Sequence, residues 1–201
     1  MEIATPSGPA LVDLDEPGSP VFLLVMTHGS NGGVATPDRL AVRAVALEMG
    51  AAVARVLQPF RVAGRRAPGP AAKQDQAWLT VVGVLRERFG DLPLILCGRS
   101  NGARVACRTA LELSALGVLA LAYPLHPPGR PERSRADELY QAGVEVVVVN
   151  GERDPFGVPD AAAGTHVHVL PGEGHGLAGD PSRVGAVVAP WLRRWSGGDP
   201  G

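Results

Sequence analysis

The chain has 201 residues, of which 45% are hydrophobic and 19% charged, and its formal net charge is −1 at pH 7. This length predicts a single domain over residues 1–201, and the near-neutral charge argues against nucleic acid or an anionic membrane surface as a partner. The longest apolar run is too short to span a membrane, and no signal peptide is recognisable, so we expect a soluble cytoplasmic protein. The composition leaves the oligomeric state open.

Short apolar runs predict the strands. Most of these runs do not alternate with polar residues, which indicates strands covered on both faces, as in a parallel sheet flanked by helices. The predicted buried strands are residues 21–26, 51–57, 92–97, 118–123, 144–149 and 165–170, preceded by a short edge strand at 10–14. The two ends of the chain, residues 1–9 and 196–201, are predicted to be loose tails.

Segments with helical periodicity separate these strands. The predicted helices are residues 37–49, 71–89, 101–116, a short one ending at 142, and 181–195. The alternation of strands and helices predicts an α/β fold with a doubly wound, mostly parallel sheet of six or seven strands. In such a sheet, ligands bind at the carboxyl ends of the strands.

The cysteines and most histidines favour structural roles. Cys97 lies in a predicted strand and Cys107 in a predicted helix, so both are expected to be buried thiols and not a disulfide. His166 and His168 alternate with valines in the last strand. No carboxylate or cysteine stands at ligand spacing from them or from His175, so we expect no metal site. The glycine-rich segments contain neither a P-loop nor a dinucleotide-binding motif, so we expect no cofactor.

The segment Gly98-Arg99-Ser100-Asn101-Gly102 has the pattern G-x-S-x-G, between a predicted strand and a predicted helix. In this context the pattern indicates a nucleophile elbow. A strand that turns directly into a helix strains the backbone of the central serine and brings the two flanking glycines close together. Glycine has no side chain to clash at such an approach. Ser100 is therefore the candidate nucleophile.

A serine nucleophile needs a base to accept its proton and a carboxylate to orient that base. Asp154 and His175 follow Ser100 in the chain order typical of this topology, each after a predicted strand. Glu152 and Asp160 are alternative acids on the same loop as Asp154. The glycines on either side of His175 are expected to let its loop approach Ser100.

The glycine-rich loop 28–33 is the candidate oxyanion loop. We expect the backbone N–H groups of Asn101 and Ser30 to bind the oxyanion, with Gly29 as a neighbour, although an ordinary strand-to-helix turn would have a similar sequence. Four further residues are predicted to form the substrate-binding surface: His28, Asn31, Arg99 and His126. His28 is also expected to brace the loop, and a role in loop shape is equally open for His126.

With these residues assigned, nearly the whole chain resembles the α/β-hydrolase superfamily. The segments THGSNGG, CGRSNGARVA, YPLHPPGRPE, NGERDPFG and GEGHG are similar to a compact, capless group akin to dienelactone hydrolases, which includes bacterial proteins and a branch of eukaryotic chromatin-complex subunits. The resemblance implies an α/β-hydrolase fold with a minimal lid, a catalytic triad of Ser100, His175 and Asp154, and ester-type hydrolysis. It departs from the group at two positions. A dienelactone hydrolase proper has a cysteine where Ser100 stands, and the group commonly has methionine or a small or apolar residue at the position of Asn101.

These observations predict a serine hydrolase, similar to carboxylesterases and thioesterases, that acts on a small carboxylic ester or thioester. The segment 124–142, where many relatives carry a lid, is short, which predicts an open and shallow site. Two alternatives stay open. One is a binding or scaffold protein that keeps the fold without the chemistry, and the other is an acyltransferase or peptidase that uses the same residues.

Overall fold

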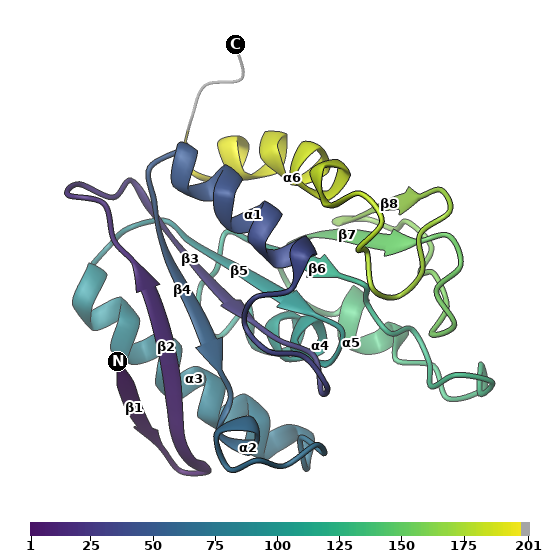
Figure 1. The fold of residues 1–201 in the computed structure, drawn as a ribbon, viewed down its shortest axis with the longest axis horizontal. Helices are drawn as coiled ribbons and strands as arrows, with labels where there is room; N and C mark the ends of the chain where they lie inside the picture. Colours follow the sequence, from purple (N-terminus) through teal and green to yellow (C-terminus); the bar gives the residue numbers. More distant parts are fainter. Residues whose placement is uncertain (198–201) are drawn as a thin grey trace.

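A computed structural model describes residues 1–197. Within this range the centre of the molecule is an eight-stranded sheet with the strand order β1-β2-β4-β3-β5-β6-β7-β8 (Figure 1). The strands are β1 (Glu2–Thr5), β2 (Gly8–Asp15), β3 (Phe22–Thr27), β4 (Ala51–Leu57), β5 (Leu94–Arg99), β6 (Gly117–Leu121), β7 (Glu145–Gly151) and β8 (Thr165–Leu170). Strands β3 to β8 are parallel, and β2 runs antiparallel to both β1 and β4. The predicted doubly wound, mostly parallel sheet is confirmed, but the predicted strand number of six or seven is wrong.

The N-terminal segment accounts for the difference in strand number. Residues 1–9 are not a loose tail, because β1 pairs with β2 and Ile3 is buried in the core. The predicted edge strand 10–14 is the middle of β2, which lies between β1 and β4, so β1 forms the edge. Only one side chain of β1 is buried, and so short a strand gives almost no periodic signal. Of the predicted tail 196–201, Ser196 caps the last helix and residues 198–201 lie outside the described residues.

Helices cover both faces of the sheet. They are α1 (Pro37–Glu48), α2 (Pro59–Val62), α3 (Ala71–Phe89), α4 (Asn101–Thr109), α5 (Ala136–Tyr140) and α6 (Pro181–Trp195). Helices α1 and α6 lie side by side on one face, and α3, α4 and α5 cover the other (Figure 1). The predicted helices 71–89 and 181–195 agree with α3 and α6, whereas α4 ends earlier than predicted and the four-residue α2 was not predicted. No helix in the described part of the chain is both long and apolar enough to cross a membrane.

The sheet separates two hydrophobic cores, one on each face. Cys97 belongs to the core under α1 and α6, and Cys107 to the core under α3 and α4. Both are free and fully buried, as predicted. Burial raises the pKa of the Cys107 thiol to about 12 and raises that of Cys97 still further, so both are neutral apolar side chains.

The order of the strands reverses at β3, which has β4 on one side and β5 on the other. At such a switch point, the loops that follow two neighbouring strands lead to opposite faces of the sheet. This leaves a crevice at the carboxyl ends of the two strands. The ends of β3, β5, β7 and β8 lie along this one edge of the sheet. The loops that follow these strands carry Ser30, Ser100, Asp154 and His175.

Gly117, the first residue of β6, provides a test of core packing. A Cβ atom built there would lie 2.4 Å from Cε2 of Trp195, whose indole N–H donates a hydrogen bond to Glu145. Because the ring cannot retreat without losing this bond, we expect Gly117→Ala to lower the free energy of unfolding by about 1–3 kcal/mol. The matched control is Gly83→Ala in α3, where an added Cβ meets nothing within 4 Å. This variant should gain about 0.5–1 kcal/mol. Urea unfolding followed by tryptophan fluorescence measures both, and a Gly117→Ala protein as stable as the wild type would contradict the packing argument.

Candidate active site

Ser100 lies on the sharp turn between β5 and α4. Its backbone has φ 53° and ψ −118°, a strained conformation for a residue with a side chain, and its N–H donates to the Leu121 carbonyl. A Cβ atom on Gly98 would lie 2.2 Å from the carbonyl oxygen of Gly102, and one on Gly102 would lie 2.7 Å from that of His28. The predicted steric need for glycine at both positions is confirmed. The turn leaves the Ser100 hydroxyl beside the loop that carries His175.

The structure brings the three predicted catalytic side chains together. His175 Nε2 lies 3.0 Å from Ser100 Oγ, and His175 Nδ1 lies 2.8 Å from Asp154 Oδ2. The Asp154 side chain is fully buried, and its other carboxylate oxygen accepts the N–H of Phe156 at 2.9 Å. The imidazole therefore bridges the serine hydroxyl and a fixed carboxylate, an arrangement that can accept a proton from Ser100.

The two alternative acids lie away from His175. The Glu152 carboxylate accepts the N–H of Gly172 on the exposed surface, and Asp160 contributes its backbone carbonyl to a hydrogen bond from Tyr140. Only Asp154 of the three candidate acids has a hydrogen bond to His175.

The loops that carry Asp154 and His175 pack directly on each other. A Cβ atom on Gly151 would lie 2.5 Å from the carbonyl oxygens of Glu173 and Gly174, so this position requires glycine. The Glu173 carboxylate accepts hydrogen bonds from the backbone N–H groups of Gly179 and Asp180. These bonds fix the segment that leads into α6. Neither Gly151 nor Glu173 was predicted from the sequence to have a role in the site.

The prediction that the glycines on either side of His175 are needed for its loop to approach Ser100 is wrong. An added Cβ on Gly174 meets nothing within 4 Å, and one on Gly176 makes only an ordinary contact with Ala178. The His175 ring is held instead by stacking on Phe156, with ring centroids 4.3 Å apart, and by the hydrogen bond to Asp154. The approach to Ser100 therefore depends on these contacts and not on the absence of side chains beside His175.

Arg99, predicted to contact substrate, ties three segments together. Its Nε donates to the fully buried carboxylate of Asp38 at 3.0 Å, and Nη2 donates to the His175 carbonyl oxygen at 2.7 Å. Arg99 also lines the catalytic pocket, but these bonds direct its guanidinium to α1 and to the loop that carries His175. Asp38 was missed because an acidic residue in the first turn of a helix is common for reasons of helix stability alone.

The predicted oxyanion loop lies against the elbow. A Cβ atom on Gly29 would lie 3.1 Å from Ser100 Cβ, and Ser30 and Asn31 line the same pocket as Ser100. Within residues 1–197, neither the backbone N–H of Ser30 nor that of Asn101 donates a hydrogen bond. The Asn101 side chain is buried and its amide donates to Gln74 of α3 at 2.7 Å.

The cavity above Ser100 has a volume of about 430 Å³. Its lining residues come from six separate segments of the chain: Ser30, Asn31, Pro68, Arg99, Ser100, Asn101, Arg104, Pro124, Arg135, Phe156 and His175. Phe156, Arg104 and Arg135 were not predicted from the sequence. No chemical motif marks such residues, because they reach the pocket only through the packing of distant segments.

Neither predicted histidine contact, His28 nor His126, lines this cavity. His28 is fully buried, so the prediction that it contacts substrate is wrong. Its Nε2 accepts the N–H of Gln58 at 2.9 Å and its Nδ1 lies 2.7 Å from the Gly29 carbonyl oxygen, which ties the predicted oxyanion loop to the end of β4. His126 packs on Gly157, where an added Cβ would lie 2.5 Å from its ring.

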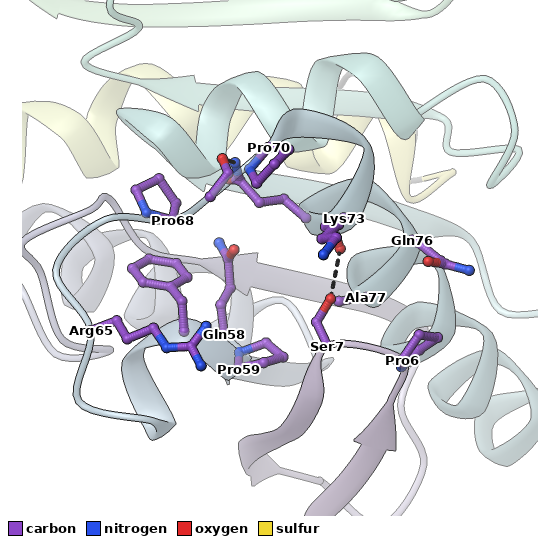
Figure 2. A pocket seen from close by; sticks show the side chains of 13 residues that line it. Pro6, Ser7, Gln58, Pro59, Arg65, Pro68, Pro70, Lys73, Gln76 and Ala77 are labelled. Atoms are coloured by element: carbon purple, nitrogen blue, oxygen red, sulfur yellow. Dashed lines mark hydrogen bonds between the residues drawn. The ribbon is translucent and has the colours of Figure 1, made fainter.

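A second cavity, of about 370 Å³, lies between the β1–β2 turn and the start of α3 (Figure 2). Pro68 lines both cavities. The one serine that lines the second cavity, Ser7, donates to the backbone carbonyl of Lys73, and no histidine lines it (Figure 2). It therefore has no nucleophile paired with a base, and the cavity above Ser100 is the candidate active site.

The two remaining histidines belong to β8 and pack against α6. His166 lies 3.1 Å from a Glu145 carboxylate oxygen and stacks on Trp191, and His168 also contacts this indole. Among residues 1–197, no three histidine, cysteine or acidic side chains gather in a way that would hold a metal ion.

The fold and the site together define a class of protein. A strained serine after β5, an aspartate after β7 and a histidine after β8, at one edge of a mostly parallel sheet, are typical of α/β hydrolases. The sequence model of the alpha/beta hydrolase domain family matches residues 20–177, and the chain belongs to this family. The predicted superfamily is confirmed. A search of curated proteins finds no match.

Solved structures agree with this assignment of the fold. XC6422 from Xanthomonas campestris, described as an α/β serine hydrolase without a lid, superposes with a TM-score of 0.77 at 17% identity, over 97% of this chain and 93% of its own. A serine hydrolase homologue from Coxiella burnetii gives a TM-score of 0.76 at 14% identity, over 96% of each chain. Est1E from Butyrivibrio proteoclasticus, solved with bound ferulic acid, gives 0.75 at 18% identity, over 97% of this chain and 98% of its own. The lidless neighbour agrees with the predicted compact, capless group.

The buried His28 predicts a pH dependence of stability. Burial lowers its pKa from 6.5 to about 4, so the unfolded chain binds a proton at this residue at a higher pH than the folded chain does. The stability that neutral His28 contributes is therefore lost as pH falls from about 7 to about 4. In this window the wild type should lose about 3 kcal/mol of unfolding free energy relative to a His28→Gln variant. Urea unfolding of both proteins at several pH values measures the difference, and equal pH slopes would refute the argument.

Proposed function

We propose that this α/β hydrolase is a serine hydrolase that cleaves a small carboxylic ester or thioester through an acyl-enzyme on Ser100. The proposal depends above all on the position of the His175 imidazole, 3.0 Å from Ser100 Oγ on one side and 2.8 Å from the Asp154 carboxylate on the other. A serine hydroxyl is a weak nucleophile at neutral pH, and this hydrogen-bonded base supplies what it lacks.

In the proposed mechanism, Ser100 Oγ attacks the carbonyl carbon while His175 Nε2 accepts its proton. Asp154 accepts the Nδ1–H of His175, which selects the tautomer whose Nε2 is free to act as a base and stabilises the imidazolium that forms. The backbone N–H groups of Ser30 and Asn101 stabilise the negative charge on the carbonyl oxygen. His175 then protonates the leaving alcohol or thiol, and a water molecule hydrolyses the acyl-enzyme by the same steps.

The size of the site supports a small substrate. The cavity above Ser100 has a volume of about 430 Å³, and the short 124–142 segment contributes only Pro124 and Arg135 to its wall. The stacked Phe156 provides an apolar surface beside His175 for an acyl chain. Among the structural neighbours, one is named as an esterase domain, from Rhodothermus marinus, and Est1E binds ferulic acid, which agrees with a carboxylic ester as substrate.

A fluorophosphonate probe tests the nucleophile. The probe should label the wild-type protein at Ser100, because His175 activates this hydroxyl, and should not label a Ser100→Ala variant. Ser7→Ala is the control, since this serine lies in the second cavity, without a histidine, and its loss should leave labelling intact. Mass spectrometry of the labelled peptide gives the site. Absence of labelling in folded wild-type protein, or labelling that persists in Ser100→Ala, would refute the proposal.

Turnover tests the chemistry itself. We expect the wild type to hydrolyse p-nitrophenyl acetate, and we expect Ser100→Ala and His175→Ala each to lower kcat/KM by about a thousandfold or more. The two losses should not add in the double variant, because the two residues act as a unit. A graded panel of acyl esters and acyl thioesters then decides between esterase and thioesterase action. Transfer of the acyl group to an added alcohol or amine in preference to water would point to an acyltransferase instead. Equal rates in wild type and His175→Ala would favour a non-catalytic protein.

A further inference from the structure

The wall of the catalytic cavity is strongly basic. Arg99, Arg104 and Arg135 line it together with Ser100 and His175, and no aspartate or glutamate lines it. A cation on a cavity wall normally has a counter-ion nearby, because removing a guanidinium from water without one is costly. The partner of each arginine therefore shows which positive charge is left for a ligand.

Two of the three arginines are neutralised within the protein. Arg99 forms an ion pair with the buried Asp38 at 3.0 Å. Arg104 binds Glu138 through both Nε and Nη2, at 2.7 and 2.6 Å. Their charges hold helices and loops in place and are satisfied before any substrate arrives.

The hydrogen bonds of the Glu138 carboxylate go to two other arginines. It also accepts a hydrogen bond from Arg108 at 2.9 Å, and Arg108 in turn binds Asp75 with two further hydrogen bonds. Arg104 and Arg108 are thus balanced by Glu138 and Asp75, two charges of each sign. This cluster of four residues is closed and neutral.

Of the three arginines on the cavity wall, Arg135 is the one that forms no ion pair with a carboxylate of residues 1–197. Its guanidinium is partly buried, and its one side-chain hydrogen bond goes to the Pro124 carbonyl oxygen at 3.3 Å. No carboxylate of residues 1–197 lies within salt-bridge distance of it. Burial, followed by the like charge of Arg104, lowers the pKa of Arg135, and the more distant negative charge of Glu138 offsets this only in part.

The backbone of Arg135 is held firmly despite its position in a loop-rich segment. Its N–H donates to the Leu125 carbonyl at 2.7 Å, and its carbonyl accepts the Tyr123 hydroxyl at 2.8 Å. The start of the side chain is therefore fixed at the cavity wall. A fixed, partly desolvated cation of this kind is well suited to bind an anion, and the planar fork of a guanidinium matches a carboxylate.

We propose that Arg135 binds a carboxylate group of the substrate, so that the substrate is a small ester or thioester with a carboxylate on its acyl or its alcohol part. One unpaired positive charge on the wall is balanced by one carboxylate. This inference rests on the proposed function, and it assigns Arg135 to specificity and not to bond cleavage.

Two pairs of matched esters test the inference. Monoethyl succinate and ethyl butyrate differ in a carboxylate or a methyl group at the end of the acyl chain, and 3-acetoxypropionate and propyl acetate differ in the same way in the alcohol. We expect the wild type to prefer the anionic member of at least one pair. In Arg135→Gln, kcat/KM for that anionic ester should fall about tenfold or more, while the neutral ester stays within about twofold. Arg135→Lys should recover part of the loss, since it keeps the charge without the planar fork.

The control variant is Arg133→Gln, an exposed arginine of the same segment that does not line the cavity. It should leave both members of each pair unchanged. Equal loss for anionic and neutral esters in Arg135→Gln would show a structural role and overturn the inference, as would a wild type without preference for either anionic ester. Ser100-dependent hydrolysis of the neutral esters in that case would leave the proposed function intact.

A binding measurement decides the matter if no ester in the panel is turned over. In the Ser100→Ala protein, which cannot form an acyl-enzyme, the anionic ester should bind at least about tenfold more tightly than its neutral match, as seen by NMR titration. The added Arg135→Gln change should abolish this preference. Equal binding of the two esters would refute the carboxylate site.

Discussion

The whole site depends on a backbone-to-backbone contact at the turn between β5 and α4. Gly98, Gly102 and the carbonyl of His28 approach so closely that a single Cβ atom on either glycine would overlap backbone atoms. This contact forces Ser100 to positive φ, and it is the surrounding sheet that holds the strained residue there. Because Ser100 and the loop 28–33 are fixed by the same contact, the position of one sets the position of the other.

Charge pairing joins the remaining parts of the site to this turn. Arg99, adjacent to Ser100, reaches both the buried carboxylate of Asp38 and the carbonyl of His175, and so connects α1, the turn between β5 and α4, and the loop that carries His175. Asp38 would be costly to bury alone, and Arg99 offsets that cost. Arg135 differs from Arg99 in this respect, because it lies on the cavity wall without a carboxylate partner among residues 1–197. Electrostatics thus separates the arginines that build the site from the one proposed to bind substrate.

Packing explains where sequence patterns and structure differ. The glycines beside His175 suggested a loop that needs bare backbone, yet added Cβ atoms there meet no close neighbour, and Phe156 orients the ring instead. His28, which the same patterns placed at the substrate, is buried and joins the oxyanion loop to the end of β4. Glycine and histidine each serve several purposes in proteins, and only their neighbours in space distinguish these purposes.

The sequence by itself determined the α/β fold, most strands and helices, and the predicted order of serine, acid and base. The strands and helices follow from local periodicity. The turn at the serine follows from five consecutive residues, two of which are the glycines that the close backbone approach requires. The tertiary structure alone decided that β1 forms the sheet edge, that Asp154 and not Glu152 or Asp160 contacts His175, and which arginines are paired. These features are set by contacts between residues far apart in the chain. No local pattern specifies such contacts, since the partners meet only when the sheet and its helices have packed.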